Sequence, residues 1–214
     1  MNQTKTNTLQ LFRYQAPVTV LGPEQRAVIW VQGCHFACSE CIVPESWSLK
    51  GGETMTVADL ADWVLAQSKI EGITLSGGEP MLQAPALVQL IETVQAQRDL
   101  GVMCYTGYQW EWLHQKGNVN QKALLDIVDL LVDGTYQKNK HEDLRWRGSA
   151  NQRLIYMSDR YLDYLGKEDS SVGIEVGMDQ GGVFVTGVPH RPGFRKILPT
   201  LEQNLLAQGI NISF

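Results

Sequence analysis

The sequence is short of cysteine and of charge, and it has no long apolar run. Its 214 residues include four cysteines, and charged residues make up 19%. No stretch of about 18 apolar residues is present to span a bilayer, and the polar residues 1–10 lack the apolar segment of a signal peptide. We therefore expect a cytoplasmic protein that does not enter the membrane and whose cysteines stay reduced.

The balance of charge also excludes one class of partner. The formal net charge is −5 at pH 7, whereas non-specific nucleic-acid binding needs a basic face. We therefore expect no nucleic-acid partner. Hydrophobic residues make up 43% of the chain, and a chain of this length should bury roughly 70% of its surface in a globular core.

Three of the four cysteines, Cys34, Cys38 and Cys41, lie within eight residues. Iron-sulfur clusters normally take four cysteines, so three thiolates would hold such a cluster and leave one iron without a protein ligand. The alternative is a structural zinc site, which needs a closed set of four ligands. The nearest candidate for the fourth, His35, is adjacent to Cys34 and poorly placed to join it. The remaining cysteine, Cys104, lies inside an apolar strand and is expected in the core.

The hydrophobic pattern alternates between strands and helices. Strands are expected at 26–32, 72–76, 101–105 and 128–133, and helices at 56–65, 85–98, 110–114 and 122–127. Residues 1–16 are interpreted as a lead-in. This order predicts an α/β fold whose parallel strands form a sheet or partial barrel. Because chemistry in such folds gathers at the C-terminal ends of the strands, we expect the cysteines, the turn at 77–80, Thr106 and Asp133 at one rim.

The turn Gly77-Gly78-Glu79-Pro80 follows the second of these strands. Two glycines let a ligand approach the backbone, and the carboxylate of Glu79 can accept a hydrogen bond from an ammonium group. An amino acid's α-amino group would suit it. On its own such a stretch is more often only a turn.

Together, the C-x3-C-x2-C spacing and the Gly-Gly-Glu-Pro turn resemble the radical S-adenosylmethionine superfamily. The resemblance implies a partial (β/α) barrel and a 4Fe-4S cluster whose open iron binds S-adenosylmethionine. One electron then yields methionine and a 5′-deoxyadenosyl radical, which abstracts hydrogen from the substrate. The implied metal ligands are Cys34, Cys38 and Cys41. The implied cofactor contacts are Gly77, Gly78, Glu79, Pro80, Thr106 and Asp133, and possible cofactor or partner contacts are Arg147, Asn151 and Arg153.

The closer resemblance is to the activating-enzyme branch, which includes the activators of anaerobic ribonucleoside-triphosphate reductase and of pyruvate formate-lyase. It covers about residues 20–155, and the matching segments are 31–34, 44–47, 75–80, 105–108, 131–134 and 146–153. Enzymes of this branch make a glycyl radical in a large partner enzyme. The resemblance therefore implies a protein partner, and an electron donor such as flavodoxin or ferredoxin.

Two features depart from this pattern. Glu40 stands just before the third cysteine, where an aromatic residue is common, and about 60 residues follow the last matching segment. We expect a core at 1–155 and a small α+β extension at 156–214, with a hairpin formed by 173–178 and 183–188 and a helix at 198–208. The extension could dock a partner or cover an open sheet edge. Two alternative functions are a radical enzyme that modifies a ribosomally made precursor peptide and a non-enzymatic iron-sulfur or zinc-binding module.

Overall fold

The computed structural model describes residues 7–167, 173–179 and 182–190, and a few positions from 192 to 208. The strands are β1 (Thr8–Val18), β2 (Arg26–Val31), β3 (Glu53–Thr56), β4 (Gly72–Gly77), β5 (Gly101–Thr106), β6 (Leu130–Asp133), β7 (His141–Leu144), β8 (Arg147–Ser149), β9 (Arg153–Tyr156), β10 (Ile174–Asp179) and β11 (Gly182–Gly187). The α-helices are α1 (Val57–Leu65), α2 (Ala84–Gln95), α3 (Trp110–Lys116) and α4 (Val119–Asp126). Short 3₁₀ helices among the described residues include η1 (Pro44–Trp47), η2 (Pro80–Leu82), η3 (Lys138–Lys140) and η4 (Asp159–Tyr164).

The main sheet has seven strands in the order β3-β1-β2-β4-β5-β6-β9. Its centre, β2-β4-β5-β6, is parallel, while β1, β3 and β9 pair antiparallel at the flanks. The predicted α/β class is therefore confirmed, and the four predicted parallel strands are all present. Within the described ranges the two ends of the sheet do not pair with each other, so the sheet is open and no closed barrel forms.

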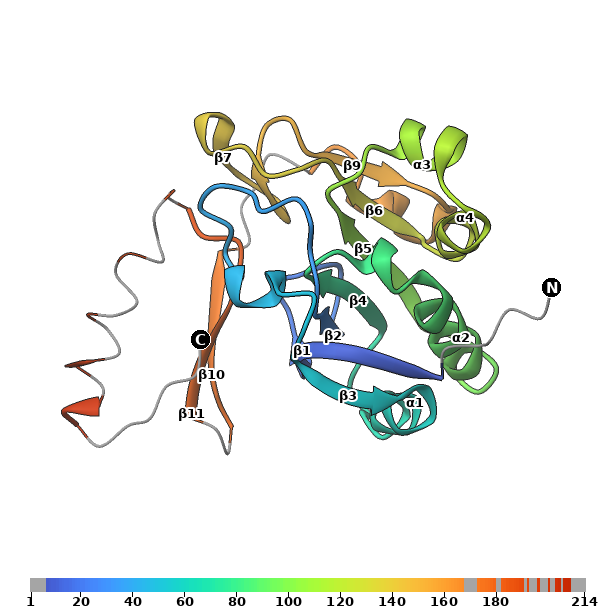
Figure 1. The fold of residues 1–214 in the computed structure, drawn as a ribbon, viewed down its shortest axis with the longest axis horizontal. Helices are drawn as coiled ribbons and strands as arrows, with labels where there is room; N and C mark the ends of the chain where they lie inside the picture. The colour runs from blue at the N-terminus through green and yellow to red at the C-terminus, as the bar shows by residue number, and fades with distance from the viewer. Residues whose placement is uncertain are drawn as a thin grey trace.

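The central strands are buried on both faces, which explains their unbroken apolar runs. In β2, Ile29 packs into the core shared with the helices, whereas Val28 and Trp30 belong to a second cluster on the opposite face. Figure 1 shows α1 and α2 on one side of the sheet, and the loop after β2 together with the β10–β11 hairpin on the other. The helices thus leave one face of the sheet for other elements.

The first helix begins where its capping residues predict. The Thr56 hydroxyl oxygen accepts a hydrogen bond from the Asp59 backbone N–H at 3.0 Å, and the same hydroxyl donates to the Asp59 carboxylate at 2.6 Å. This arrangement satisfies a backbone donor that the first turn would otherwise leave free. The predicted start of α1 is confirmed.

The interpretation of residues 1–16 as a lead-in is wrong for residues 8–16. They form most of β1, an 11-residue strand that pairs with β2 on one side and β3 on the other. Leu9 and Leu11 are fully buried, but the residues between and after them are largely polar or half-buried. A strand near the edge of a sheet buries only alternate residues, so its sequence carries a weaker signal than a central strand.

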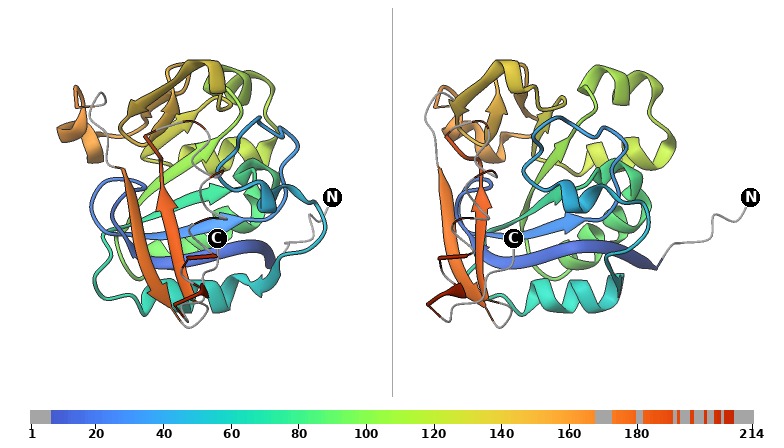
Figure 2. Two further views of the ribbon diagram at one scale, coloured as in Figure 1. Left: turned by 90° about the vertical axis from the view of Figure 1, so that its left-hand side faces the viewer. Right: turned by 60° about the vertical axis from the view of Figure 1, so that its left-hand side comes forward.

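The predicted hairpin is present as β10 and β11, which form their own two-stranded sheet. It is attached through Glu175, whose carboxylate accepts hydrogen bonds from the Thr19 backbone N–H at 2.9 Å and hydroxyl at 3.2 Å. Val188 packs against the apolar cluster around Trp30. Figure 2 shows the hairpin crossing in front of the main sheet. Most of the predicted helix at 198–208 lies outside the described residues.

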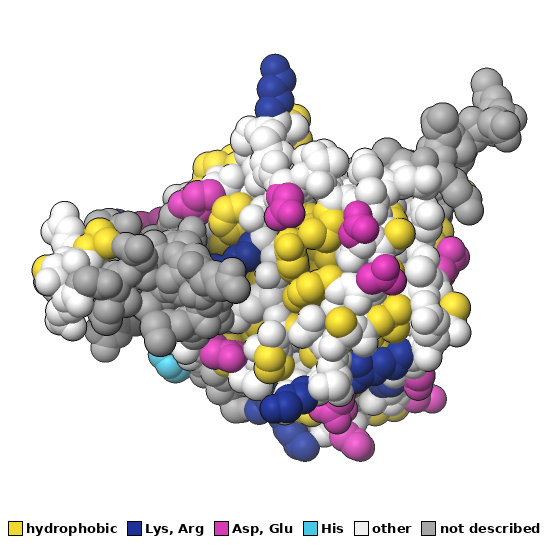
Figure 3. All heavy atoms as spheres, turned by 90° about the horizontal axis from the view of Figure 1, so that it is seen from below, with side chains coloured by type: hydrophobic (Ala, Val, Ile, Leu, Met, Phe, Trp, Pro, Cys, Tyr) yellow, Lys and Arg dark blue, Asp and Glu magenta, His cyan; other side chains and the backbone are white. Residues whose placement is uncertain are grey.

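Two further observations bear on the predicted environment. No helix among the described residues is long and apolar enough to cross a membrane. On the face that Figure 3 shows, acidic and basic side chains both lie among hydrophobic ones, without a continuous basic surface on that face.

Candidate active site

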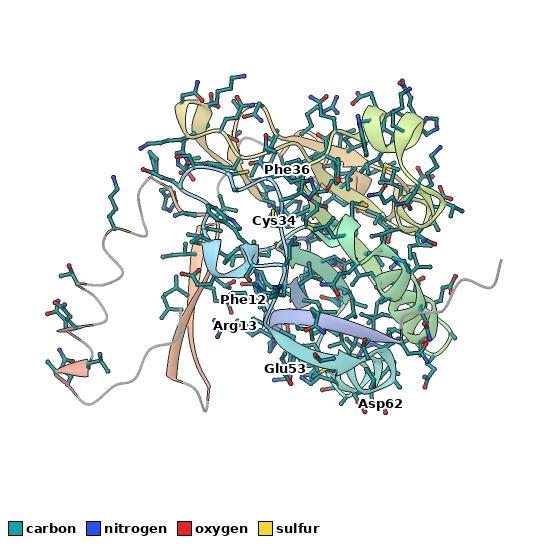
Figure 4. The ribbon with its side chains drawn as sticks, viewed as in Figure 1. Phe12, Arg13, Cys34, Phe36, Glu53 and Asp62 are labelled. Atoms are coloured by element: carbon teal, nitrogen blue, oxygen red, sulfur yellow. The ribbon has the colours of Figure 1, made fainter. Side chains whose placement is uncertain are left out.

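The three clustered cysteines lie on residues 33–47, here called the cluster loop, which leaves the C-terminal end of β2. Its two ends are tied together, because the Gly33 N–H donates to the Ser46 carbonyl at 2.7 Å and the Cys34 N–H to the Trp47 carbonyl at 3.0 Å. The Gln32 side chain donates to the Glu45 carbonyl at 3.1 Å. Figure 4 shows Cys34 on the cluster loop above β1. The loop therefore forms a closed arch over the face of the sheet that lies opposite α1 and α2.

The cluster-loop thiols are half-buried neighbours. Burial raises the pKa of Cys34, and the backbone N–H groups of Phe36 and Ala37 oppose that rise. Burial also raises the pKa of Cys38, with a further contribution from the nearby Cys41 and Cys34 thiols. The thiols therefore release their protons when a metal binds, which couples metal affinity to pH.

The donor set fits a 4Fe-4S cluster better than a single zinc ion. The cluster loop offers three thiols, one fewer than the ligands of a structural zinc site. A cubic cluster binds each cysteine through a different iron, so its ligands need not converge on one point, whereas a structural zinc needs four ligands around one ion. Cys104 is fully buried in β5, as expected of a core residue.

Glu79 ties the ends of β4 and β5 together. Its side chain is only 1% exposed. One carboxylate oxygen accepts from the Met81 N–H at 2.9 Å and the Thr106 hydroxyl at 2.8 Å, and the other from the Gly107 N–H at 2.8 Å. Burial raises the pKa of Glu79 to about 7, and these three hydrogen bonds oppose the rise. The structure thus gives this carboxylate three internal donors, where the sequence suggested an ammonium group.

The Gly-Gly-Glu-Pro turn packs directly against the start of the cluster loop. The Gly78 N–H donates to the Val31 carbonyl and the Glu79 N–H to the Gly33 carbonyl, both at 2.8 Å. A Cβ atom at Gly78 would collide with the Gly33 carbonyl oxygen. At the next strand end, a Cβ at Gly107 would lie 2.5 Å from the Phe36 ring. Glycine is therefore needed here for close approach between segments.

We expect Gly78→Ala to weaken the seating of the cluster loop. The added methyl group collides with backbone atoms, which cannot rotate away, and overpacking of this kind costs about 1–3 kcal/mol. Iron bound per chain after anaerobic reconstitution should fall below the wild-type value. Ser39→Ala, at an exposed position of the same loop, is the matched control and should bind iron normally. Equal iron content in the two variants would contradict this packing argument.

Asp133 and Arg153 pair with each other at the end of β6. Asp133 is 1% exposed and accepts from the Trp110 N–H at 2.8 Å and from Nε of Arg153 at 2.9 Å. Arg153 also donates to both oxygens of Glu111, at 2.8 and 2.7 Å. The predicted role of Asp133 as a cofactor contact stays a prediction, and its carboxylate already has these protein partners.

The other two predicted contact residues hold the segment after β6 in shape. Arg147 donates to the Gln152 carbonyl at 3.2 Å, and the Asn151 amide to the Thr135 carbonyl at 2.8 Å. The Gln152 side chain donates to the Gly134 carbonyl at 3.2 Å. These bonds fold residues 134–153 back over the end of the sheet, beside the cluster loop.

A cavity of about 470 Å³ lies between the cluster loop, the open face of the sheet and the hairpin. Cys38 and Cys41 line it, so two ligands of the predicted cluster face this cavity. Sequence patterns did not single out its other walls, which are side chains from several distant segments. They include Phe12, Trp30 and Tyr105 from the sheet, Tyr136 from the segment after β6, and Ile174 and Val185 from the hairpin. For Phe12, Trp30 and Tyr105, the sequence offers one signal for a position in the cavity wall. Alternate residues of a strand point to the same face of the sheet.

Comparison with known proteins shows the family to which the chain belongs. Residues 20–155 match the family described as a 4Fe-4S single cluster domain. An anaerobic ribonucleoside-triphosphate reductase-activating protein of Enterobacteria phage T4 is 35% identical over 146 residues, which cover 65% of this chain and 89% of the relative. Proteins of the same name are 37% identical in Vibrio cholerae (64% of this chain, 91% of the relative) and 33% identical in Escherichia coli strain K12 (66% and 95%).

The chain belongs to the activating-enzyme branch of the radical S-adenosylmethionine superfamily. It is therefore an enzyme of the oxidoreductase type with a 4Fe-4S cluster domain. Every predicted site residue lies within the matched residues 20–155, whereas the β10–β11 hairpin lies outside them. The hairpin is thus a wall of the cavity that the family match does not cover.

Proposed function

We propose that this enzyme reductively cleaves S-adenosylmethionine and passes the resulting radical to a protein partner, a glycyl-radical enzyme. The observation that carries the proposal is the position of the three thiols. They lie on one arch whose base, at Gly33, is hydrogen-bonded to the Gly-Gly-Glu-Pro turn, and two of them line a cavity. The names of the relatives support an anaerobic ribonucleotide reductase as the partner.

The chain's own residues would divide the work as follows. Cys34, Cys38 and Cys41 would hold three irons and leave the fourth open. When bound, the cluster supplies the electron that cleaves the sulfonium bond and produces the 5′-deoxyadenosyl radical. We propose that Gly77, Gly78, Glu79, Pro80, Thr106 and Asp133 form the strand-end wall against which S-adenosylmethionine lies.

The walls of the cavity would restrict the reaction, because only a substrate segment that can enter the cavity would meet the radical. Phe12, Trp30 and Tyr105 give the cavity an aromatic wall on the side of the sheet, which would make that side unfavourable for water. We propose that the open sheet is the partial barrel of this superfamily, formed by a core at 1–155, and that 156–214 is an extension that covers it. The electron donor would be a flavodoxin or ferredoxin.

The experiment is anaerobic reconstitution with iron and sulfide, followed by reduction with dithionite in the presence of S-adenosylmethionine. We expect 5′-deoxyadenosine and methionine to form in equal amounts, and only when the cluster is present. Reconstituted protein that binds four irons but forms no 5′-deoxyadenosine would contradict the proposal.

A second candidate is modification of a short precursor peptide, which the hairpin wall favours because it lies beyond the family match. Electron paramagnetic resonance separates the two candidates. A glycyl-radical signal on the anaerobic reductase of the same organism supports the first. A mass change in a peptide encoded beside this chain, without such a signal, supports the second.

A further inference from the structure

Glu40 occupies an unusual position in the cluster loop, between two of the predicted iron ligands. The Cys41 N–H donates to the Cys38 carbonyl at 3.1 Å, which closes a tight turn around Glu40. The backbone of Glu40 is in the left-handed region, with φ at 60°. Non-glycine residues rarely adopt this conformation, and the side chain of Glu40 makes contacts outside the loop.

Those contacts come from two lysines, Lys138 in the segment that follows β6 and Lys196 beyond the hairpin. Nζ of Lys138 lies 2.5 Å from one Glu40 carboxylate oxygen, and Nζ of Lys196 lies 3.6 Å from the same oxygen. Tyr136 lines the same cavity as Cys38. Residues 136–138 therefore adjoin the turn on the side of a predicted metal ligand and bind the acidic side chain beside it.

The Glu40 carboxylate also faces the cavity that the cysteines line. Its side chain is 20% exposed, and Glu40, Cys38 and Cys41 are all lining residues. The second carboxylate oxygen is buried and has no hydrogen-bond partner among the described residues. A charge in this position is shielded less by solvent than a surface charge is, so its field acts on whatever the cysteines hold.

We infer that the Glu40–Lys138 ion pair tunes the reduction potential of the cluster and positions the Cys38–Cys41 turn. The inference rests on the proposed cluster site. A cluster that accepts an electron gains negative charge, and the potential of such clusters depends on the charges around them. Glu40 therefore opposes reduction and makes the potential more negative, while Lys138 partly cancels that effect. A more negative potential makes the cluster a stronger reductant of a sulfonium.

The test measures the potential of the reconstituted full-length protein by electron paramagnetic resonance at poised potentials, without S-adenosylmethionine. We expect Glu40→Gln to shift the potential to more positive values and Lys138→Met to more negative values. The double variant should lie between the two. Lys140→Met and Glu142→Gln make the same charge changes at exposed positions of η3 and β7 and should leave the potential at the wild-type value.

Opposite signs are what distinguish tuning from a structural role, because a loosened loop would shift both variants in the same direction. Shifts of the same sign, or shifts no larger than those of Lys140→Met and Glu142→Gln, would overturn the inference. If Glu40→Gln loses iron, Lys138→Met alone decides: an unchanged or more positive potential overturns it. Wild-type protein that forms no 4Fe-4S cluster would instead refute the proposed function.

Discussion

Cys38→Ala is expected to form 5′-deoxyadenosine more than about 100-fold more slowly than the wild type. Replacing a residue that only hydrogen-bonds a metal ligand typically lowers metal affinity or activity 10–100-fold, and replacing the ligand itself should have a larger effect. Cys38 is one of three thiols available on the cluster loop, and it lines the cavity. Its loss leaves two thiolates for a cluster that normally takes four. The measurements are iron and sulfide bound per chain, and 5′-deoxyadenosine formed after reduction with dithionite.

Cys104→Ala is the matched control for this experiment. Cys104 is the fourth cysteine of the chain, but it is fully buried in β5 and packs in the core with the helices. We expect this variant to bind iron as the wild type does and to form 5′-deoxyadenosine at the wild-type rate. Activity retained by Cys38→Ala and lost by Cys104→Ala would show that the ligand assignment is wrong.

Glu79→Ala is expected to lower the free energy of unfolding by about 3 kcal/mol or more, because each buried donor left without a partner costs about 1–3 kcal/mol. Three donors depend on this carboxylate: the Met81 N–H, the Thr106 hydroxyl and the Gly107 N–H. The measurement is urea unfolding of the metal-free protein at pH 6. Glu92→Ala, at an exposed position of α2, is the control and should stay within about 0.5 kcal/mol of the wild type. Equal stability of the two variants would contradict a structural role for Glu79.

The same side chain predicts a pH dependence with a definite sign. Burial raises the pKa of Glu79 from its ordinary 4.5 to about 7 in the folded protein. The folded state therefore binds this proton more tightly than the unfolded state. This proton therefore adds to the free energy of unfolding. The added stability is fully present below about pH 4.5 and is lost as the pH rises through 7, a change of about 3 kcal/mol. Glu79→Gln, which cannot ionise, should remove this part of the pH dependence. The measurement is the free energy of unfolding between about pH 4.5 and 8, and the same profile in the variant and the wild type would contradict a raised pKa for Glu79.

The parallel core of the fold could be predicted from the sequence because its strands are buried on both faces. The apolar runs around Ile29 and Leu75 each produce such a strand, and the Thr56 cap marks the start of α1. β1 and β9 could not be predicted in the same way. β1 buries only some of its residues, and β9 contains four residues, of which three are half-buried and one is exposed. Hydrophobic periodicity is weak in such strands.

The sequence predicted that residues at the strand ends lie together, but not their hydrogen bonds or the aromatic walls of the cavity. Strand order placed Glu79 and Thr106 at one rim, and the structure joins them at 2.8 Å. That Glu79 faces inward, and that Asp133 pairs with Arg153, follow from side-chain packing that spacing does not encode. The pairing of Glu40 with Lys138 links positions 98 residues apart, which no local motif indicates.

The central claim is that three thiolates hold a 4Fe-4S cluster and leave one iron open for S-adenosylmethionine. Mössbauer spectroscopy of protein reconstituted with isotopically enriched iron tests it directly, before and after addition of S-adenosylmethionine. The account predicts that the signal of one iron in four changes when S-adenosylmethionine binds, while the other three keep theirs. Four irons that all keep their signals, or a site that takes up only a single metal ion, would contradict it.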